Sequence, residues 1–357
     1  MIIKSISLRN YRNYEKVDVN FDEKINYFIG NNGQGKTNLL EAILFLSLTK
    51  SHRINDDKKL IKDNNNFSKI NALIYDEKDI KLETIIHKNG KSLSINNYQI
   101  NKVSDFIGKL NVILFSPDDL FLFNDLPRER RKIIDQEISK INQKYLFSLN
   151  KYKNLIKDKN NLLKNKEIDI NYLDVINEQL IDESEVIIKE RIKIIEILNK
   201  NINRIYKLLS NENSEISIEY KKCIDDVDIK DGLKKLYENT KQKDIDYKVA
   251  SEGIHREDFL FLMDKEPLIN IASQGQKRMV VLSFKLALIN YIYQQTNKYP
   301  ILLLDDVLSE LDKNHRERLI NLLKDKNQCI ITTTEDIDID KNIKKFYVKN
   351  GTVKEIS

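Results

Sequence analysis

The stretch that decides the fold is Gly30-Asn31-Asn32-Gly33-Gln34-Gly35-Lys36-Thr37, which matches the phosphate-binding pattern G-x-x-x-x-G-K-[ST] at every fixed position. The apolar run 25–29 precedes it, and the helix-like stretch 38–44 follows it. Glycines in such a loop let backbone N–H groups turn toward phosphate oxygens, and the start of the next helix adds a partial positive charge. We therefore predict a nucleoside triphosphate site, in which Lys36 contacts the β- and γ-phosphates and Thr37 binds Mg²⁺.

A second motif lies near the other end of the chain, where the apolar run 301–304 ends in Asp305 and Asp306. A buried strand that ends in two carboxylates predicts a metal and catalytic site. Asp305 would hold Mg²⁺ opposite Thr37, and Asp306 would orient or deprotonate the attacking water. The alternative is an acidic N-cap of the next helix. Because the chain also contains a phosphate-binding loop, we favour the metal site.

A third motif, Ser273-Gln274-Gly275-Gln276, precedes an apolar helical stretch upstream of the two carboxylates. Ser273 is placed as an N-cap or as a hydroxyl that contacts an anion, and Gly275 permits close approach to a ligand. Lys277 and Arg278 in a first helical turn oppose the helix dipole unless an anion is near. An ordinary capped helix is the alternative interpretation of this short motif.

The composition is that of a soluble globular protein, with 32% charged and 41% hydrophobic residues among 357. No apolar run approaches the roughly 20 residues needed to span a bilayer, so we expect no membrane association. The N-terminus alternates like a strand and lacks a signal peptide's apolar core. Cys223 and Cys329, the only cysteines, are far apart in the sequence, which disfavours a disulfide framework or zinc site. We predict a cytoplasmic protein. The net charge of +5 permits contact with a polyanion but does not require it.

The chain divides into three zones by hydrophobic period. Residues 1–115 are mixed α/β, and Asn89-Gly90 predicts a type I′ hairpin. Within about 128–210, two apolar faces at helical spacing flank a break at 166–169, which predicts an antiparallel helical hairpin. From about 245 the α/β character returns. Further strands are expected at 2–8, 17–21, 70–75, 80–86, 93–95, 329–333 and 346–348.

We therefore predict an α/β head formed by both chain ends, residues 1–115 and 245–357. A mainly α-helical lobe, residues 116–244, is inserted between them. The arms of the helical hairpin are too short for an extended coiled-coil rod, and nothing at the turn is suited to chelate a metal.

The phosphate-binding loop, S-x-G-Q, the strand with two carboxylates and Ser309-Glu310-Leu311-Asp312, in that order, resemble the ABC-type ATPases, specifically their SMC-like branch. The resemblance implies two ATP molecules clamped between two heads, with Ser273 of one subunit on the γ-phosphate held by the other. It implies catalytic roles for Lys36, Asp306 and, in trans, Ser273, and Mg²⁺ binding by Thr37 and Asp305. The implied nucleotide contacts are Gly30, Asn31, Asn32, Gly33, Gln34, Gly35, Lys36, Thr37, Arg12, Ser273, Gly275 and Gln276.

SMC proteins insert hundreds of coiled-coil residues, which this chain lacks, and its short inserted lobe is similar to that of the RecF family. Segment 8–14 resembles that family's "L-x-N-F-R-N-Y/F", and 115–120 its "F-S-P-x-D-L". Segment 127–135 resembles "P-x-x-R-R-x-F-L-D", and 253–258 resembles "G-P-H-R-D-D". The matches extend over the whole chain.

Three departures from the related patterns bear on the chemistry. Ile254 and Glu257 stand where the family usually has Pro and Asp, which puts the rigidity of the loop with His255 and Arg256 in question. Asp306 replaces the Glu of most ABC ATPases, so its reach to water is shorter. The strand that ends at 332–334 lacks the switch histidine of ABC transporters. The last two departures suggest slow hydrolysis that times a complex.

The family resemblance implies an ATP-dependent DNA-binding protein of recombinational repair, replication restart and the SOS response, and a weak DNA-dependent ATPase. ATP would close a homodimer on DNA at single-strand gaps or duplex/single-strand junctions, without sequence preference, and hydrolysis would release it. The implied partners are RecR and RecO, which help load RecA. Arg12 is expected either to touch phosphate or to pack on the nucleotide.

The basic cluster of Arg128, Arg130, Arg131 and Lys132 is a candidate for phosphate contacts, which would make DNA binding sensitive to salt. The alternatives for this cluster are a solvated face or internal ion pairs. Two further functions stay open from the sequence. One is an ATPase subunit of a membrane transporter, and the other is a scaffold that dimerises on ATP with negligible hydrolysis.

Overall fold

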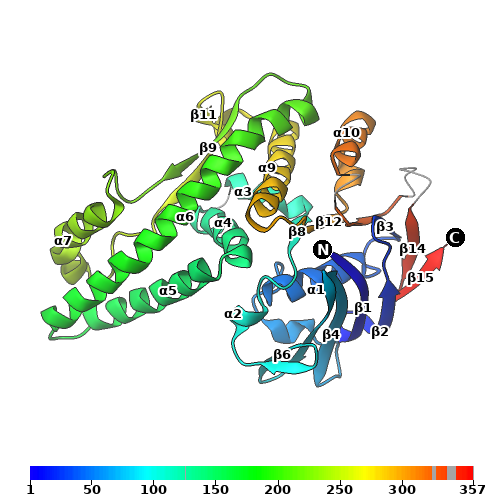
Figure 1. The fold of residues 1–357 in the computed structure, drawn as a ribbon, viewed down its shortest axis with the longest axis horizontal. Coiled ribbons are helices and arrows are strands. Elements are labelled where there is room, and N and C mark those ends of the chain that lie inside the picture. The colour runs from blue at the N-terminus through cyan, green and yellow to red at the C-terminus, as the bar shows by residue number, and fades with distance from the viewer. Residues whose placement is uncertain (125, 324–326, 336–342, 357) are drawn as a thin grey trace. The chain divides into compact units, whose positions relative to one another are not determined.

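The computed structural model describes residues 1–124, 126–323, 327–335 and 343–356 (Figure 1). Its contacts divide the chain into two compact units. Unit 1 contains both chain ends and consists of Met1–Asp119, Lys207–Asn211 and Val281–Ser357. Unit 2 consists of Leu120–Tyr206 and Glu212–Val280. An α/β head built from both ends of the chain, with a mainly helical insertion, is thus the observed architecture.

The second boundary between the compact units differs from the expected one at residue 245, because it falls inside α9 (Gln274–Thr296). Residues 245–280 belong to unit 2 because they pair and bond within it. β10 (Asp258–Met263) pairs antiparallel with β9 (Ile216–Lys221) along its whole length. The backbone N–H of Ala250 also donates to the Asn160 side chain at 2.7 Å.

The first sheet of unit 1 is antiparallel, with strand order β2-β1-β4-β5-β6-β7. Its strands alternate buried and exposed positions, as expected for a sheet with one face on the core. Their bounds are β1 Ile2–Tyr11, β2 Tyr14–Asn20, β4 Phe67–Asp76, β5 Lys78–His87, β6 Gly90–Ile95 and β7 Tyr98–Ile100.

The second sheet of unit 1 positions the candidate site. Its order is β15-β14-β3-β13-β12-β8, and all neighbours are parallel except β15, which pairs antiparallel with β14. Every position of β3, β8, β12 and β13 is buried, which explains their unbroken apolar runs. The bounds are β3 Ile25–Ile29, β8 Val112–Phe115, β12 Ile301–Asp305, β13 Cys329–Thr333, β14 Lys344–Lys349 and β15 Thr352–Ile356.

Helix α1 (Lys36–Leu48) contributes to a core shared by both sheets of unit 1. Its residues from Leu39 to Ser47 are buried on all sides, as expected for a helix that is apolar all round. The remaining short elements and helix of this part of the chain are η1 Asp57–Leu60, α2 Val103–Phe106, η2 Pro117–Leu120, η3 Val307–Glu310 and α10 Lys313–Leu323.

Unit 2 is built on long helices and a three-stranded sheet of order β11-β10-β9. The predicted helical hairpin is confirmed: α5 ends at Leu163, α6 begins at Ile170, and Lys151 pairs with Glu183 across the hairpin at 2.8 Å. A break at Asn142, which caps α5, was not predicted. The bounds are α3 Phe121–Asn124, α4 Pro127–Ile141, α5 Gln143–Leu163, α6 Ile170–Ser210, α7 Ile229–Tyr247, α8 Leu268–Ile271 and β11 Glu266–Pro267.

The type I′ interpretation of Asn89-Gly90 is wrong, although the β5–β6 hairpin itself is present. The register pairs His87 with Gly90, so Lys88 and Asn89 are the two turn residues. Neither has a positive φ, which a type I′ turn requires of both. Gly90 instead takes the positive φ, at 143°, as the first residue of β6.

Within the described ranges, no helix combines the length and the apolar character that crossing a membrane requires.

Candidate nucleotide-binding site

The predicted phosphate-binding loop connects the end of β3 to the start of α1, as the motif requires. Two of its glycines have a structural reason. A Cβ at Gly30 would lie 2.3 Å from the carbonyl oxygen of Val348, so only glycine fits beside β14. Gly35 occupies the N-cap position of α1 with a φ of 121°, a conformation that side chains other than glycine rarely adopt.

Two neighbouring turns brace this loop. Asn13 donates from Nδ2 to the Gln34 carbonyl at 2.9 Å, and the Tyr14 hydroxyl donates to the Gly35 carbonyl at 3.0 Å. From the β14–β15 turn, the N–H of Gly351 donates to the Gln34 carbonyl at 3.1 Å, and Asn350 N–H to its side chain at 2.7 Å. Sequence reasoning missed these braces. The sequence gives no clear indication of them, because the bracing residues lie in two turns that are distant in sequence from the loop.

Lys36 is buried, and its amine lies among oxygen atoms. Nζ donates to the carbonyl of Gly30 at 2.5 Å and of Asn31 at 3.1 Å. Burial lowers the pKa of Lys36, while the negative charges of Asp306 and Asp305 act in the opposite direction. The structure thus brings Lys36 of the loop near Asp305, the last residue of β12, and Asp306, the next residue, as the two motifs predicted.

Thr37 and Asp305 meet although 268 positions separate them in the sequence. The Thr37 hydroxyl donates to Asp305 Oδ1 at 3.0 Å. Thr332, at the end of the neighbouring strand β13, donates to the same carboxylate oxygen at 2.7 Å. Mg²⁺ prefers a small number of carboxylate and hydroxyl oxygens together with phosphate and water. This donor set therefore fits the predicted metal, and Thr37 and Asp305 stay its predicted protein ligands.

Asp306 is held in a left-handed conformation with a φ of 55°. Its N–H donates to the Thr332 carbonyl at 3.1 Å, and the Ser309 hydroxyl donates to its Oδ1 at 2.8 Å. Asp306 stands at the N-cap position of η3, yet its side chain makes no capping hydrogen bond. The N-cap alternative therefore gains no support. The contacts of Ser309 and Thr332 were not predicted.

Arg12 forms a two-pronged pair with a fully buried carboxylate. Its Nε and Nη2 donate to the two oxygens of Glu41 at 2.9 and 2.8 Å, and Ser51 donates to Glu41 at 2.5 Å. Burial raises the pKa of Glu41, but the hydrogen bonds from Arg12 and Ser51 and nearby positive charge outweigh this and lower it. Arg12 thus bonds to α1 near the loop. Its contact with nucleotide stays a prediction.

The S-x-G-Q motif lies in unit 2, at the start of α9. Ser273 and Gln276 form a reciprocal capping box: the Ser273 N–H donates to Gln276 Oε1 at 2.9 Å, and the Gln276 N–H donates to Ser273 Oγ at 3.2 Å. Gln276 Nε2 also donates to Glu212 at 3.0 Å. Lys277 in the first turn donates to the Ile269 carbonyl at 3.2 Å. The capped-helix interpretation is therefore correct for the local structure, and a contact of Ser273 with a phosphate stays a prediction.

Gly275 is not explained by this capped helix. It is exposed, its φ is not positive, and a Cβ there would meet no atom closer than Ser273 Oγ at 4.0 Å. The fold of unit 2 therefore does not require glycine at this position. The missing side chain leaves room for the close approach of another molecule.

Two of the four residues in the basic cluster are engaged inside unit 2. Arg130 pairs with Asp258 through two hydrogen bonds of 2.8 Å, with side chains 11% and 17% exposed. Arg131 donates to the Glu257 carbonyl. This favours the internal ion-pair alternative for Arg130, and Arg131 is also engaged internally, through a backbone carbonyl. Arg128 and Lys132 are exposed, and Lys132 pairs with Glu129 at 3.0 Å.

A buried arginine from α6, missed by sequence reasoning, organises this interior. Arg191 pairs with Asp135 at 2.8 Å and with Glu257 at 2.6 Å, and donates to the Ile254 carbonyl at 3.1 Å. Ile254 and Glu257 are the two positions that depart from the family pattern. Both are buried and bonded, so the loop is fixed despite the substitutions.

His255, in the same loop, has two neutral hydrogen-bond partners. Its Nδ1 lies 2.7 Å from the Tyr152 hydroxyl, and its Nε2 lies 3.3 Å from the Ala250 carbonyl. Burial is the main cause that lowers the pKa of His255 to about 4. The ring is therefore neutral at pH 7 and acts as a structural hydrogen-bonding group. Arg256 beside it is exposed.

Comparisons with known proteins agree along the whole chain. The family model described as "RecF/RecN/SMC N terminal domain" matches residues 2–354. The DNA replication and repair protein RecF of Clostridium perfringens (strain SM101 / Type A) is 41% identical over 360 residues, 99% of each chain. That of Oenococcus oeni is 39% identical over 371 residues, again 99% of each.

Solved structures agree with the sequence matches. The structure described as "recombination mediator protein RecF-ATP in RecFOR pathway" superposes with a TM-score of 0.93 at 30% identity, covering 99% of this chain and 97% of that one. An Smc head bound to the C-winged helix domain of ScpA has a TM-score of 0.58 at 17% identity, covering 100% and 97%. The second likeness shows a shared fold.

Proposed function

The chain belongs to the RecF family of DNA replication and repair proteins, and on that premise we propose that it is an ATP-dependent DNA-binding protein of recombinational repair. The observation that carries the proposal is the contact between Thr37 of the phosphate-binding loop and Asp305 of β12, with Lys36 beside both. A solved relative is described as RecF-ATP. This family membership leaves the transporter alternative without support.

ATP is the proposed nucleotide and Mg²⁺ the proposed metal. Backbone N–H groups of the loop Gly30–Thr37 would cradle the phosphates, and Lys36 would contact the β- and γ-phosphates. Thr37 and Asp305 would hold Mg²⁺, which would supply positive charge to offset the negative charge that develops on the phosphates. Braced by the two turns at Asn13 and Gly351, the loop is ordered before nucleotide arrives.

Asp306 is the proposed group that orients the attacking water. Its backbone is fixed by Thr332, and its carboxylate accepts from Ser309 at 2.8 Å. A carboxylate already bonded, on a side chain one methylene shorter than glutamate, is a weaker base for water. We therefore expect slow hydrolysis, in which turnover sets the lifetime of a complex.

Ser273 is proposed to complete the site of a second subunit, which makes the ATP-bound form a homodimer. Gly275 supports this, because its missing side chain leaves open space beside the exposed Ser273. The closed dimer would grip DNA at gaps or duplex/single-strand junctions. RecO and RecR are the proposed partners in loading RecA, since a solved relative is described as part of the RecFOR pathway.

Sizing the protein by light scattering, with and without ATP and a gapped duplex, tests this function. We expect ATP-dependent dimers that retain the duplex. Lys36→Arg should impair phosphate release, while Lys24→Arg, an exposed lysine outside the site, should not. Asp306→Asn should trap an ATP-bound dimer.

Three outcomes would contradict parts of the proposal. Monomeric Asp306→Asn protein in excess ATP would contradict the clamp. Turnover of tens per second would contradict slow hydrolysis. If wild type and Lys36→Arg both dimerise on ATP and neither releases phosphate, the protein is the ATP-dimerised scaffold instead.

A further inference from the structure

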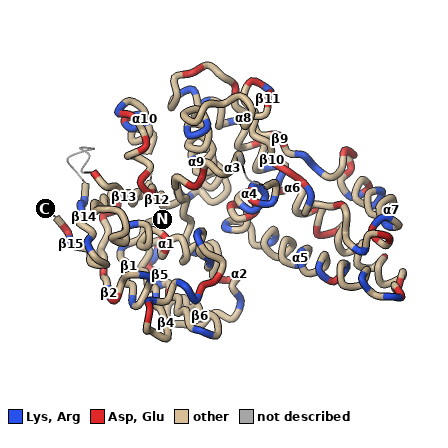
Figure 2. Tube along the Cα trace, turned by 180° about the vertical axis from the view of Figure 1, so that it is seen from behind, with Lys and Arg blue, Asp and Glu red and all other residues tan. Residues whose placement is uncertain are grey.

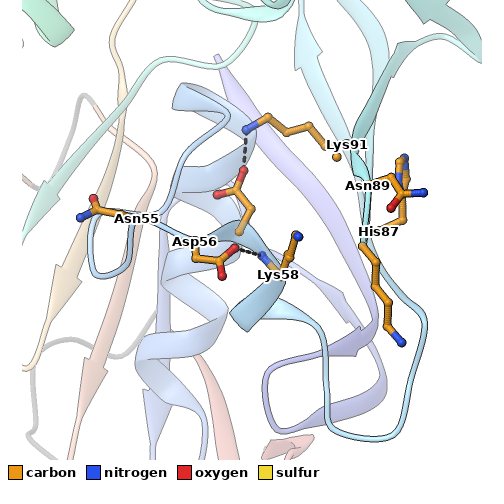
Figure 3. Close-up of a pocket in the computed structure, with 9 residues that line it drawn as sticks. Asn55, Asp56, Lys58, His87, Asn89 and Lys91 are labelled. Atoms are coloured by element: carbon orange, nitrogen blue, oxygen red, sulfur yellow. Dashed lines mark hydrogen bonds and ion pairs between the residues drawn. The ribbon is translucent and has the colours of Figure 1, made fainter.

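Unit 1 contains a groove of about 510 Å³. None of the residues that line it belongs to the phosphate-binding loop. One wall is the segment that follows α1, and the other is the turn of the β5–β6 hairpin. Figure 3 shows Asn55, Asp56 and Lys58 on the first wall and His87, Asn89 and Lys91 on the second. We call residues 50–59 and 87–91 together the basic groove.

The basic groove carries most of the chain's net charge. Its fifteen residues contain six lysines or arginines and two aspartates, an excess of four positive charges. The net charge of all 357 residues is +5. The rest of the molecule is therefore nearly neutral, with both signs interspersed along elements such as α7 (Figure 2). Such local concentration is the electrostatic footprint of a polyanion site.

The two aspartates do not neutralise the exposed lysines. Asp57 pairs with Lys91 at 2.6 Å, and Lys91 also donates to the Thr49 carbonyl at 2.5 Å. Asp56 accepts from the backbone N–H of Lys58 at 3.1 Å, as the cap of η1. In the described part of the chain, five exposed basic side chains of the groove have no ion-pair partner: Lys50, Arg53, Lys58, Lys59 and Lys88.

The lining selects among polyanions. Among the nine residues around the groove, His87 has the single aromatic ring and none is Phe, Tyr or Trp, so the lining lacks the succession of aromatic rings on which unpaired bases stack. Asn55 and Asn89, both exposed, add neutral amide donors on opposite walls. A lining dominated by lysines and amides suits a sugar–phosphate backbone, which is contacted without regard to base sequence.

We infer that the basic groove binds the phosphate backbone of duplex DNA. The inference rests on the proposed function, which it deepens by naming the DNA-contacting surface of the head. Lys58 and Lys59 contact phosphates from one wall and Lys88 from the other.

A hydrogen-bond chain connects this surface to the nucleotide site. Arg53 Nη1 donates to Asn38 Oδ1 at 3.2 Å, and Asn38 Nδ2 donates to Asn13 Oδ1 at 2.8 Å. Asn13 in turn donates to the Gln34 carbonyl of the phosphate-binding loop at 2.9 Å. DNA in the groove is thus three hydrogen bonds from the loop that holds ATP.

Charge reversal of Lys58, Lys59 and Lys88 to Glu together tests the inference. The matched control reverses three exposed lysines of the same unit that lie on β2, the β2–β3 loop and β15: Lys16, Lys24 and Lys354. Both variants change the net charge equally. Duplex and single-strand affinities are measured by fluorescence anisotropy with ATP over a range of salt concentrations, and thermal unfolding checks that both variants fold.

We expect the groove variant to lose at least about tenfold in duplex affinity at low salt, and its log–log salt slope to shrink by about 2.7, for three lost phosphate contacts. The control should behave like wild type within about twofold. Equal losses in both variants, or a groove variant with an unchanged slope, would overturn the groove while leaving the proposed function intact. A loss confined to single strands would also overturn it. Wild-type protein that binds no DNA would overturn both.

Discussion

The basic cluster on α4 of unit 2 and the basic groove of unit 1 differ in how far the fold has already engaged their positive charges. On α4 of unit 2, Arg130 and Arg131 are bonded to Asp258 and to the Glu257 backbone. In the basic groove of unit 1, Lys58 and Lys88 are exposed with no ion-pair partner among the described residues. A run of basic residues is therefore no measure of binding capacity. What decides it is whether carboxylates from elsewhere in the fold have already engaged the charges.

The sharpest test of this contrast is removal of the buried arginine of unit 2. Arg191→Ala leaves Asp135 and Glu257 without their main partner, so we expect a loss of about 3–5 kcal/mol in unfolding free energy. Lys189→Ala on the exposed face of the same helix should change it by less than about 0.5 kcal/mol. Calorimetry that resolves the unfolding of unit 2 measures both. An equal, small effect of the two would mean that the interior charges are not structural.

A pH titration probes the same interior. His255 has its pKa lowered from 6.5 to about 4, so the unfolded chain binds the proton more readily. Stability should therefore be full above about pH 6.5 and fall as the pH drops toward 4, by about 2–3 kcal/mol. His255→Gln should remove this fall. If the stability of the variant still declined as steeply as that of wild type across this pH range, groups other than His255 would cause the decline.

A substitution of Arg130 tests whether this arginine stabilises the fold or contacts DNA. Arg130→Gln should cost about 1–3 kcal/mol of stability because it breaks a charged, two-pronged pair with Asp258. The folded variant should keep the wild-type salt slope for DNA. Exposed Arg128→Gln, on the same helix, is the control for stability and should be nearly neutral. If the salt slope of DNA binding fell by about one unit in Arg130→Gln, Arg130 would contact a phosphate, and the two basic regions would not differ as described.

The smallest effect on stability is expected for a substitution of Gly275. This substitution tests whether the open space beside Gly275, and not a charge, is available to a partner. Gly275→Ala meets no atom within 4.0 Å, so the unfolding free energy should change by less than about 0.5 kcal/mol. ATP-dependent dimerisation should nonetheless be lost, because the added methyl fills the gap that the proposed partner approaches. Size-exclusion chromatography with ATP tests it. Normal dimers would show that the space is unused.

Much of the head could be predicted because its signals are local. The loop Gly30–Thr37 and the strands 25–29, 301–305 and 329–333 carry their own patterns of glycine, carboxylate or unbroken apolar residues. Parallel strands then bring their carboxyl ends to one edge of the sheet, so the meeting of Thr37 with Asp305 followed from topology.

The rest was hidden because the partners are distant in sequence. Nothing near Arg12 indicates that Glu41, 29 positions away, will pair with it, and Arg191 reaches partners 56 and 66 positions away. The placement of residues 245–280 in unit 2 likewise depends on the pairing of β10 with β9. The sequence shows where the arginines lie along the chain. It does not show which carboxylates lie next to them once the chain has folded.

The hydrogen-bond chain from Arg53 through Asn38 and Asn13 to Gln34 has a thermodynamic consequence. If it transmits strain, DNA and ATP are coupled ligands, and linkage requires each to change the other's affinity by the same factor. A tenfold gain for ATP on adding duplex would then mean a tenfold gain for duplex on adding ATP, or about 1.4 kcal/mol. Exchange of ATP for ADP would then change the affinity for DNA without a large movement of any residue that contacts DNA.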